Sequence, residues 1–259
     1  MDTSPGDRWQ RFTPTFAENQ AKAAAGIIGL STDEVGVSDF QDFLSPLAHR
    51  IAIYSTRIPM APVATPETLA AMGPHLTGSA ALLVPESRLD VIAFSCTSGT
   101  VAIGLHNVHA AIEKARPGVK VSTPMEAGAK ALKLMGAQKI VLLTPYRVAT
   151  AELVAGFFEE AQFSLQGCGT FDLDGDPDMN RVSPDAIIGA AADLCARTKE
   201  FDAVFVSCTG MRTYRTMARL EAAIGKPCVS SNQALAWDTA RQAGVTDQVS
   251  GLGSLFHSY

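Results

Sequence analysis

The chain lacks the features of several large protein classes. No apolar run reaches the ~20 residues that a membrane-spanning helix needs, and residues 1–25 carry charges where a secretory signal has an apolar core. Lys and Arg together number 21 against 26 Asp and Glu, and the net charge of −5 offers no basic surface to nucleic acid. We therefore expect a cytoplasmic protein that binds neither a membrane nor nucleic acid.

Cysteine is also scarce. The 259 residues include five cysteines, an odd number, and no Cys-x-x-Cys pair. This argues against a disulfide framework and against a thiolate metal site, and it predicts reduced thiols. Cys168, Cys195 and Cys228 have no counterpart in a repeated motif, and we expect them to be structural.

What is present points to a globular α/β protein. Hydrophobic residues make up 47% of the chain and charged residues 18%, a composition that supports a sizeable core. Beyond a polar N-terminal extension at residues 1–24, short apolar runs alternate with helical patterns. That alternation predicts largely parallel sheets with helices between successive strands.

One motif occurs twice. Asp90-Val-Ile-Ala-Phe-Ser-Cys-Thr-Ser-Gly-Thr100 is matched by Asp202-Ala-Val-Phe-Val-Ser-Cys-Thr-Gly210 at a constant offset of 112 residues. Each copy is a short apolar run followed by Ser-Cys-Thr and a turn. The pattern predicts a buried parallel strand that carries a cysteine at its carboxyl end, where a helix begins. The repeat continues, because Gly136 matches Gly244 at an offset of 108.

From this duplication we infer an α/β fold of two pseudo-symmetric lobes, at residues 25–118 and 119–250. Each lobe is expected to hold a mostly parallel four-stranded sheet flanked by helices. The pattern leaves open that terminal elements cross back to the first lobe. Such symmetry predicts an active site in the cleft between the lobes, where the strand ends face each other.

Cys96 and Cys208 are the candidate catalytic pair. A helix amino terminus offers free N–H groups that bind a carboxylate and lower a thiol pKa, and Gly210 lets the backbone approach a ligand closely. One thiolate could then remove a proton while the opposite thiol returns one, without a cofactor or metal. Neighbouring hydroxyl groups that could stabilise the resulting enediolate belong to Thr97, Ser98 and Thr209.

Three further residues have two open interpretations each. Tyr146 lies at the carboxyl end of the predicted strand 139–144, either as a core aromatic or as a donor to substrate. Asn180 is either an ordinary loop residue or a substrate contact. Asp33, in the loop after the first strand, is either a solvated loop residue or a substrate-binding one.

At these residues the sequence resembles the aspartate/glutamate racemase superfamily, and within it the branch that holds maleate cis-trans isomerase, arylmalonate decarboxylase and the ectoine-utilisation protein EutA, with EutA the most similar. The matching stretches cover about residues 25–255. They are Cys96-Thr-Ser-Gly-Thr-Val, Leu142-Leu-Thr-Pro-Tyr146, Asn180-Arg-Val, Ser207-Cys-Thr-Gly210 and Pro227-Cys-Val-Ser-Ser231.

The resemblance implies a cofactor-independent enzyme in which Cys96 and Cys208 are catalytic and Asn180 contacts substrate. It also implies that Thr97, Ser98, Tyr146 and Thr209 bind the substrate carboxylate. The decarboxylase branch has Gly at the first cysteine position, so Cys96 argues against decarboxylation. Maleate isomerases usually carry Asn in the first-strand loop, where this chain reads Ser31-Thr-Asp-Glu34. This loop and the unbroken Cys-Thr-Ser-Gly-Thr-Val look more like the ectoine-utilisation group.

Three functions follow as hypotheses. The first is a racemase or epimerase of a small carboxylate, either an amino acid or an ectoine-derived acid, that transfers protons between two cysteines. The second is a maleate-type cis-trans isomerase with a cysteine nucleophile, and the third is a binding protein for a small carboxylate. We also expect a homo-oligomer, either a dimer or a tetramer.

Overall fold

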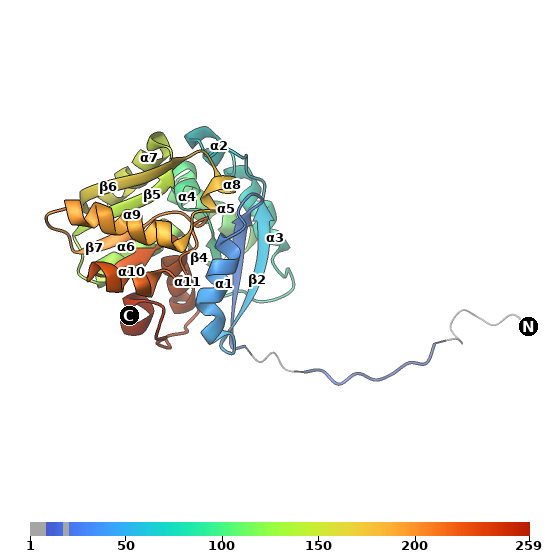
Figure 1. Ribbon diagram of the computed structural model, residues 1–259. Coiled ribbons are helices and arrows are strands. Elements are labelled where there is room, and N and C mark those ends of the chain that lie inside the picture. Colours follow the sequence, from blue (N-terminus) through green and yellow to red (C-terminus); the bar gives the residue numbers. More distant parts are fainter. Residues whose placement is uncertain (1–8, 18–20) are drawn as a thin grey trace, which may run out of the picture.

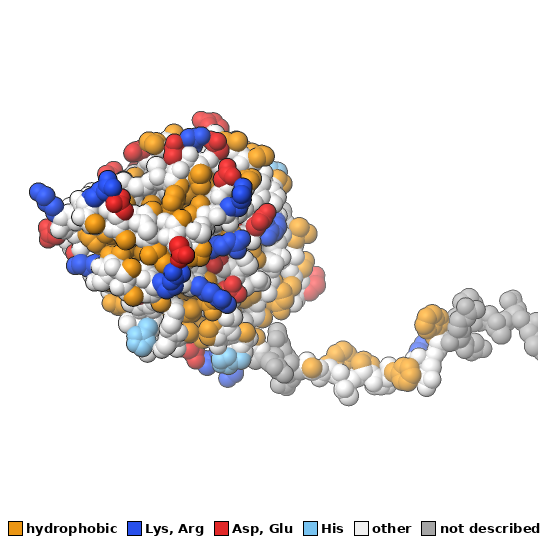
Figure 2. Space-filling view, in the orientation of Figure 1, with side chains coloured by type: hydrophobic (Ala, Val, Ile, Leu, Met, Phe, Trp, Pro, Cys, Tyr) orange, Lys and Arg blue, Asp and Glu red, His pale blue; other side chains and the backbone are white. Residues whose placement is uncertain are grey.

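The computed structural model of the chain describes residues 9–17 and 21–259. Of the predicted N-terminal extension, residues 1–8 and 18–20 lie outside the described residues. Residues 9–17 form neither helix nor strand and run away from the body of the molecule (Figure 1). The side chains of Trp9, Phe12 and Phe16 are largely exposed on this segment (Figure 2).

The described strands form two parallel sheets of four strands each, in the orders β2-β1-β3-β4 and β6-β5-β7-β8. This confirms the predicted pair of four-stranded sheets. The strands are β1 (Ala23–Leu30), β2 (Ile51–Ile58), β3 (Val91–Phe94), β4 (Lys120–Ser122), β5 (Lys139–Tyr146), β6 (Ser164–Leu173), β7 (Ala203–Val206) and β8 (Cys228–Ser230).

Helices connect the strands and cover the sheets (Figure 1). The α-helices are α1 (Gly36–Leu44), α2 (Pro66–Ala70), α3 (Leu76–Leu82), α4 (Thr97–Ile103), α5 (Leu105–Ala115), α6 (Pro124–Leu134), α7 (Val148–Glu160), α8 (Asp176–Met179), α9 (Pro184–Arg197), α10 (Met217–Ile224), α11 (Ser231–Gln242) and α12 (Ser254–Ser258). Two short 3₁₀ turns are η1 (Ser45–Leu47) and η2 (Gly73–His75). None of the described helices is long and apolar enough to cross a membrane.

The two sheets repeat one topology, in which the first strand of each lies between the second and the third. The central strands are apolar on both faces, and every residue of β3 and β7 is buried. Strands of this kind require cover on both sides of the sheet, which the intervening helices supply. Because the strands of each sheet are parallel, their carboxyl ends lie at one edge of the sheet. Ser-Cys-Thr follows β3 in the first sheet and β7 in the second.

The helices that follow the fourth strands pack across the molecule. In α6, a Cβ added at Gly128 would lie 2.5 Å from the ring of Phe205 in the second sheet. In α11, Gln242 donates to the carbonyl of Val121 in β4, and Asp238 accepts from Ser122 at 2.7 Å. The helix after each sheet thus contacts the other sheet. The limits of the lobes along the chain stay a prediction.

The repeated glycines end these two helices. Gly136 follows α6 with φ +73°, and Gly244 follows α11 with φ +81°. Both backbone angles lie in the left-handed region that glycine adopts without strain, which is the usual way for a helix to stop. The offset of 108 residues in the sequence therefore marks equivalent helix ends in the structure.

Candidate functional site

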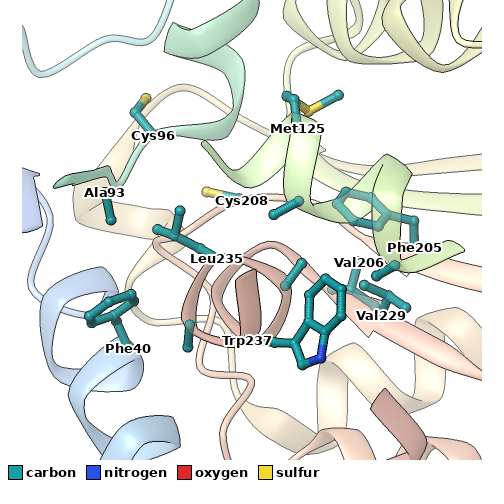
Figure 3. Close-up of a cluster of buried hydrophobic side chains, with 14 of the residues drawn as sticks. Phe40, Ala93, Cys96, Met125, Phe205, Val206, Cys208, Val229, Leu235 and Trp237 are labelled. Carbon is teal, nitrogen blue, oxygen red and sulfur yellow. The ribbon is translucent and has the colours of Figure 1, made fainter. Parts of the chain in front are cut away.

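Cys96 and Cys208 lie at the carboxyl ends of β3 and β7, as the repeat predicts. Figure 3 shows Cys96 beside α4 and Cys208 nearer to α11. Cys96 caps α4, which begins at Thr97. The prediction of a helix directly after Cys208 is wrong, because the chain forms turns up to Thr216 and α10 begins only at Met217.

The two cysteine turns are joined through buried hydrogen bonds. The Thr97 hydroxyl donates to Ser231 Oγ at 2.8 Å, and the backbone N–H of Cys208 donates to the same oxygen at 3.1 Å. The Thr209 hydroxyl donates to the carbonyl of Ser95 at 3.2 Å. Residues that are 112 positions apart in the sequence therefore form one buried unit.

The surroundings of the two sulfur atoms are similar. Cys96 Sγ accepts the N–H of Gly99 at 3.3 Å, and Cys208 Sγ accepts the N–H of Gly210 at 3.3 Å. Burial raises the pKa of both thiols, the nearby Asp176 raises it further, and the glycine N–H groups oppose the rise. The raised pKa favours the neutral thiol at both positions.

The backbone of Cys208 is strained. Its φ is +95°, in a region that residues other than glycine rarely occupy, whereas Cys96 is extended with φ −153°. Such a conformation costs about 1–3 kcal/mol and persists where the surrounding structure enforces it. Here Asn232 enforces it by donating to the carbonyls of Thr209 and Met211.

The predicted carboxylate-binding residues are all buried near the thiols. The Tyr146 hydroxyl accepts from Ser207 Oγ at 3.3 Å, and its hydrogen bond with the Cys208 side chain opposes the rise in the pKa of that thiol. Burial raises the pKa of Tyr146, and Cys208 raises it further, so this side chain is a donor at neutral pH. Thr97 and Thr209 already use their hydroxyl protons between the two turns, and Ser98 is buried beside Cys96.

Asn180 and Asp33 approach the same place from two loops. The Asn180 side-chain amide donates to the carbonyl of Thr32 at 3.0 Å. Asp33 Oδ1 accepts the N–H groups of Val35 and Gly36 at 2.7 and 2.8 Å. Burial raises the pKa of Asp33, while these two N–H groups lower it.

Asp176 and Ser231 complete the site, and neither was among the residues predicted from the sequence. Asp176 Oδ2 accepts from the Thr32 hydroxyl, and burial raises the pKa of Asp176 to about 6. Its signal in the sequence is a run of alternating acids, Asp172, Asp174, Asp176 and Asp178, which is typical of a solvated loop. Ser231 lies at the equivalent of Thr123-Pro124, where the repeat predicts only a helix start.

The loops that carry these residues are tightly closed. A Cβ added at Gly175 would lie 1.8 Å from the carbonyl oxygen of Pro62, and the N–H of Ala64 donates to the carbonyl of Asp174 at 2.8 Å. Cys96 and Cys208 are only 4% and 5% exposed. The two thiols are therefore buried, and the loops at residues 62–64 and 174–176 contact each other directly.

Metal binding has no support among the residues that the structure describes. No three His, Cys, Asp or Glu side chains within residues 9–17 and 21–259 are grouped as a metal ion requires. All five cysteines are free thiols. The chemical resources of the site are therefore two thiols, buried carboxylates, hydroxyl groups and backbone N–H groups.

Comparison with known proteins follows from this geometry. A sequence model of the arylmalonate decarboxylase family matches residues 81–256. An arylmalonate decarboxylase from Bordetella bronchiseptica is 31% identical over 131 residues, which are 49% of this chain and 53% of that protein. The match thus spans about half the length of that relative. A maleate isomerase from Pseudomonas putida is 26% identical over 214 residues, 80% of this chain and 84% of the isomerase.

The solved structures show the same fold. A mutant of Nocardia farcinica maleate cis-trans isomerase, with a covalently bound succinylcysteine intermediate, superposes with a TM-score of 0.83 at 21% identity. The superposition covers 92% of this chain and 99% of the isomerase. Because the family match extends over more than half of the chain and includes both cysteine turns, the chain belongs to the arylmalonate decarboxylase family.

Proposed function

We propose that the protein is a cofactor-independent isomerase of a small carboxylate and that it performs cis-trans isomerisation through a cysteine nucleophile. The observation that carries this proposal is the joining of two buried thiols, Cys96 and Cys208, in one closed site by Ser231 and by the Thr209–Ser95 bond. The similarity to two kinds of cysteine-bearing relatives supports a cysteine-dependent enzyme, and the maleate isomerases match more of the chain than the decarboxylase does.

The chemistry needs one thiolate and one hydrogen-bond donor to the substrate carboxylate. The thiolate adds to one carbon of the double bond, so a C–S bond forms and the π electrons move toward the substrate carboxylate as an enediolate. Rotation about the new single bond follows, and expulsion of the thiolate restores the double bond in the other geometry. The Tyr146 hydroxyl, which is hydrogen-bonded with the Cys208 side chain, donates to the enediolate oxygen once that thiol has reacted.

The relative with a bound intermediate supports the covalent step. In the Nocardia farcinica isomerase the intermediate is named as a succinylcysteine, which is a carboxylic acid joined to a cysteine sulfur. Two thiols in similar surroundings allow one to act as nucleophile, while the other protonates the enediolate carbon to give such an adduct and takes the proton back before the thiolate leaves. Cys208, with its strained backbone held by Asn232, and Cys96, at the start of α4, are both positioned for either part.

The test is turnover of small cis-unsaturated acids, with maleate and isocrotonate as probes, followed by proton NMR. We expect formation of the trans acid, and we expect Cys96→Ser and Cys208→Ser each to lower the rate by about 100-fold or more. Intact-mass spectrometry of the variants should reveal an adduct on one cysteine. Cys195→Ser is the matched control, since this cysteine lies in α9 away from both turns. Full turnover by either active-site variant would contradict the proposal.

Racemisation or epimerisation of an amino acid is the second candidate. It is favoured by the near equality of the two thiols, each of which accepts one glycine N–H at 3.3 Å, as two-sided proton transfer requires. The two reactions separate in deuterated water, because a racemase exchanges the Cα hydrogen of its substrate for deuterium and needs no double bond.

A further inference from the structure

Asp39 is a buried acid that the reaction proposed above does not use. It lies in α1 and is 6% exposed. Its Oδ2 accepts the N–H and the hydroxyl of Thr213 at 2.9 and 2.8 Å, and the N–H of Tyr214 at 3.1 Å. The same oxygen accepts the side-chain amide of Asn232 at 2.9 Å. No ion pair of the described residues includes Asp39, so hydrogen bonds stabilise its charge.

The Asn232 amide connects this carboxylate to the Cys208 turn. Besides Asp39, its nitrogen donates to the carbonyls of Thr209 and Met211, at 2.9 and 3.2 Å. Its oxygen is buried and has no hydrogen-bond donor in the described part of the chain. Rotation of the amide by half a turn would bring this oxygen against three acceptors, one of them a carboxylate. Asp39 therefore helps to fix the orientation in which the Asn232 nitrogen faces the turn.

One peptide group carries this orientation to the sulfur of Cys208. The carbonyl of Thr209 and the N–H of Gly210 belong to the same planar trans peptide, so they point in opposite directions. Asn232 donates to the carbonyl, and the N–H donates to Cys208 Sγ at 3.3 Å. This N–H opposes the rise that burial causes in the pKa of Cys208, because it stabilises the thiolate. If the Asn232 amide moves, the N–H turns away from the sulfur.

Cys96 lacks this connection. Its sulfur accepts the N–H of Gly99, which lies in the first turn of α4 and is oriented by the helix itself. Within the described ranges, no side-chain hydrogen bond joins Asp39 or Asn232 to residues 95–100. The two thiols of one molecule can therefore be compared directly, with Cys96 as the internal reference.

We propose, on the basis of the function proposed above, that Asp39 is a positioning residue for Cys208 and that it acts through Asn232 and the peptide between residues 209 and 210. It keeps one N–H group directed at the sulfur that reacts. The negative charge of Asp39 would by itself disfavour a nearby thiolate. Positioning and charge therefore have opposite consequences in a variant that removes the charge and keeps the shape of the side chain.

Alkylation by iodoacetamide tests the proposal in a single sample. Initial rates at Cys96 and Cys208 are followed by peptide mass spectrometry at one fixed pH. Asp39→Asn replaces a carboxylate oxygen by an NH₂ group, which cannot accept the surrounding N–H and hydroxyl groups. Asn232→Ala removes the connection and leaves the charge at position 39 in place.

We expect both variants to lower the ratio of the Cys208 rate to the Cys96 rate by about threefold to tenfold. The thiolate fraction of Cys208 falls, and the greater nucleophilicity of a more basic sulfur offsets only part of this loss. An effect of charge alone would instead raise the ratio in Asp39→Asn. A ratio in Asp39→Asn that equals or exceeds the wild-type ratio would overturn the proposal.

Asp238→Asn is the matched control. Asp238 is a buried acid on the same helix as Asn232, it accepts from Ser122 at 2.7 Å, and its hydrogen bonds lie away from the Cys208 turn. This variant should keep the wild-type ratio even where it lowers stability, and a fall equal to that of Asp39→Asn would overturn the proposal. The two test positions lie on different helices, so one variant remains informative where the other folds poorly.

Turnover separates this inference from the proposed function. With maleate or isocrotonate as probe, Asp39→Asn should lower kcat and leave KM within about twofold of the wild-type value, because the groups that bind substrate are unchanged. A raised KM with unchanged kcat would overturn the positioning role and leave the isomerase proposal intact. A fall in the alkylation ratio, in a protein whose wild type turns over no unsaturated acid, would have the reverse meaning.

Discussion

A buried acid beside two thiols has opposing effects on stability and on function. Asp176 is 8% exposed, and its position next to both cysteines has a cost when the carboxylate is charged. Burial raises its pKa from 3.8 to about 6, the Thr32 hydroxyl lowers it, and Asp33 raises it further. A group of this kind is tolerated in a fold when it serves a purpose other than stability.

The sign of the pH effect follows from this shift. Between about pH 4 and pH 6 the folded protein holds the Asp176 proton more firmly than the unfolded chain does, so the free energy of unfolding falls as pH rises through this window. Asp176→Asn removes the effect. The free energy of unfolding of the variant minus that of the wild type should therefore be about 3 kcal/mol larger above pH 6 than at pH 4. Urea unfolding at both pH values measures it.

Asp178→Asn is the control for this experiment. Asp178 is exposed, so the substitution removes a surface charge and leaves the buried charge of Asp176 in place. If the free energy of unfolding of both variants depends on pH as that of the wild type does, burial of the Asp176 charge does not limit stability.

The sequence predicts much of the site at this scale. The seven other predicted residues lie buried around Cys96 and Cys208, because strand ends and the loops beside them are where a parallel sheet gathers functional groups. Asp176 escaped prediction because its neighbours are solvated. Asp172 and Asp174 pair with Arg147 on the surface, and only the position of α8 against the β1–α1 loop turns Asp176 inward.

At the scale of elements, the packing of α6 against the second sheet rests on a missing side chain. Gly128 → Ala adds a Cβ that would lie 2.5 Å from the ring of Phe205, which is fully buried and has no room to move away. We expect a loss of about 1–3 kcal/mol in the free energy of unfolding, despite the better helix propensity of alanine. Chemical denaturation measures the change.

Gly156 in α7 makes a matched control, because a Cβ there meets no atom within 4 Å. Gly156→Ala should stabilise the protein by about 0.5–1 kcal/mol through helix propensity alone. Equal effects at Gly128 and Gly156 would mean that α6 does not pack on Phe205 in solution.

Sequence patterns predict the strands of this protein better than they predict where every helix begins. The alternation of apolar runs and helical patterns is enough for two four-stranded parallel sheets, since strand length and burial are local properties. The helix expected directly after Cys208 is replaced by turns, because Thr213 is held by Asp39 of α1, which accepts from the Thr213 N–H and hydroxyl. Such long-range contacts leave no periodic signal in the sequence.

At the scale of the whole molecule, one hydroxyl group joins both halves of the site. Ser231 Oγ accepts from Thr97 in the first turn and from the Cys208 N–H in the second. Ser231→Ala leaves two buried donors without an acceptor, and we expect a loss of about 2–4 kcal/mol in the free energy of unfolding. Hydrogen exchange at the Cys208 amide should also become faster.

Ser87→Ala is the control for this substitution, since Ser87 is an exposed serine away from both turns. It should change stability by no more than about 0.5 kcal/mol. A Ser231→Ala protein as stable as the Ser87→Ala protein would show that the bridge is not a structural link between the turns.

The close approach of Gly175 to the Pro62 carbonyl has a consequence for isotopes. With this contact closed, bulk water is kept from the enediolate, and a proton taken up by the enediolate carbon and lost again comes from a thiol and not from the solvent directly. The trans acid formed in a single turnover in deuterated water, begun with protonated thiols, would then carry no deuterium. A larger side chain at position 175 would hold the loops apart and let deuterium in from the first turnover.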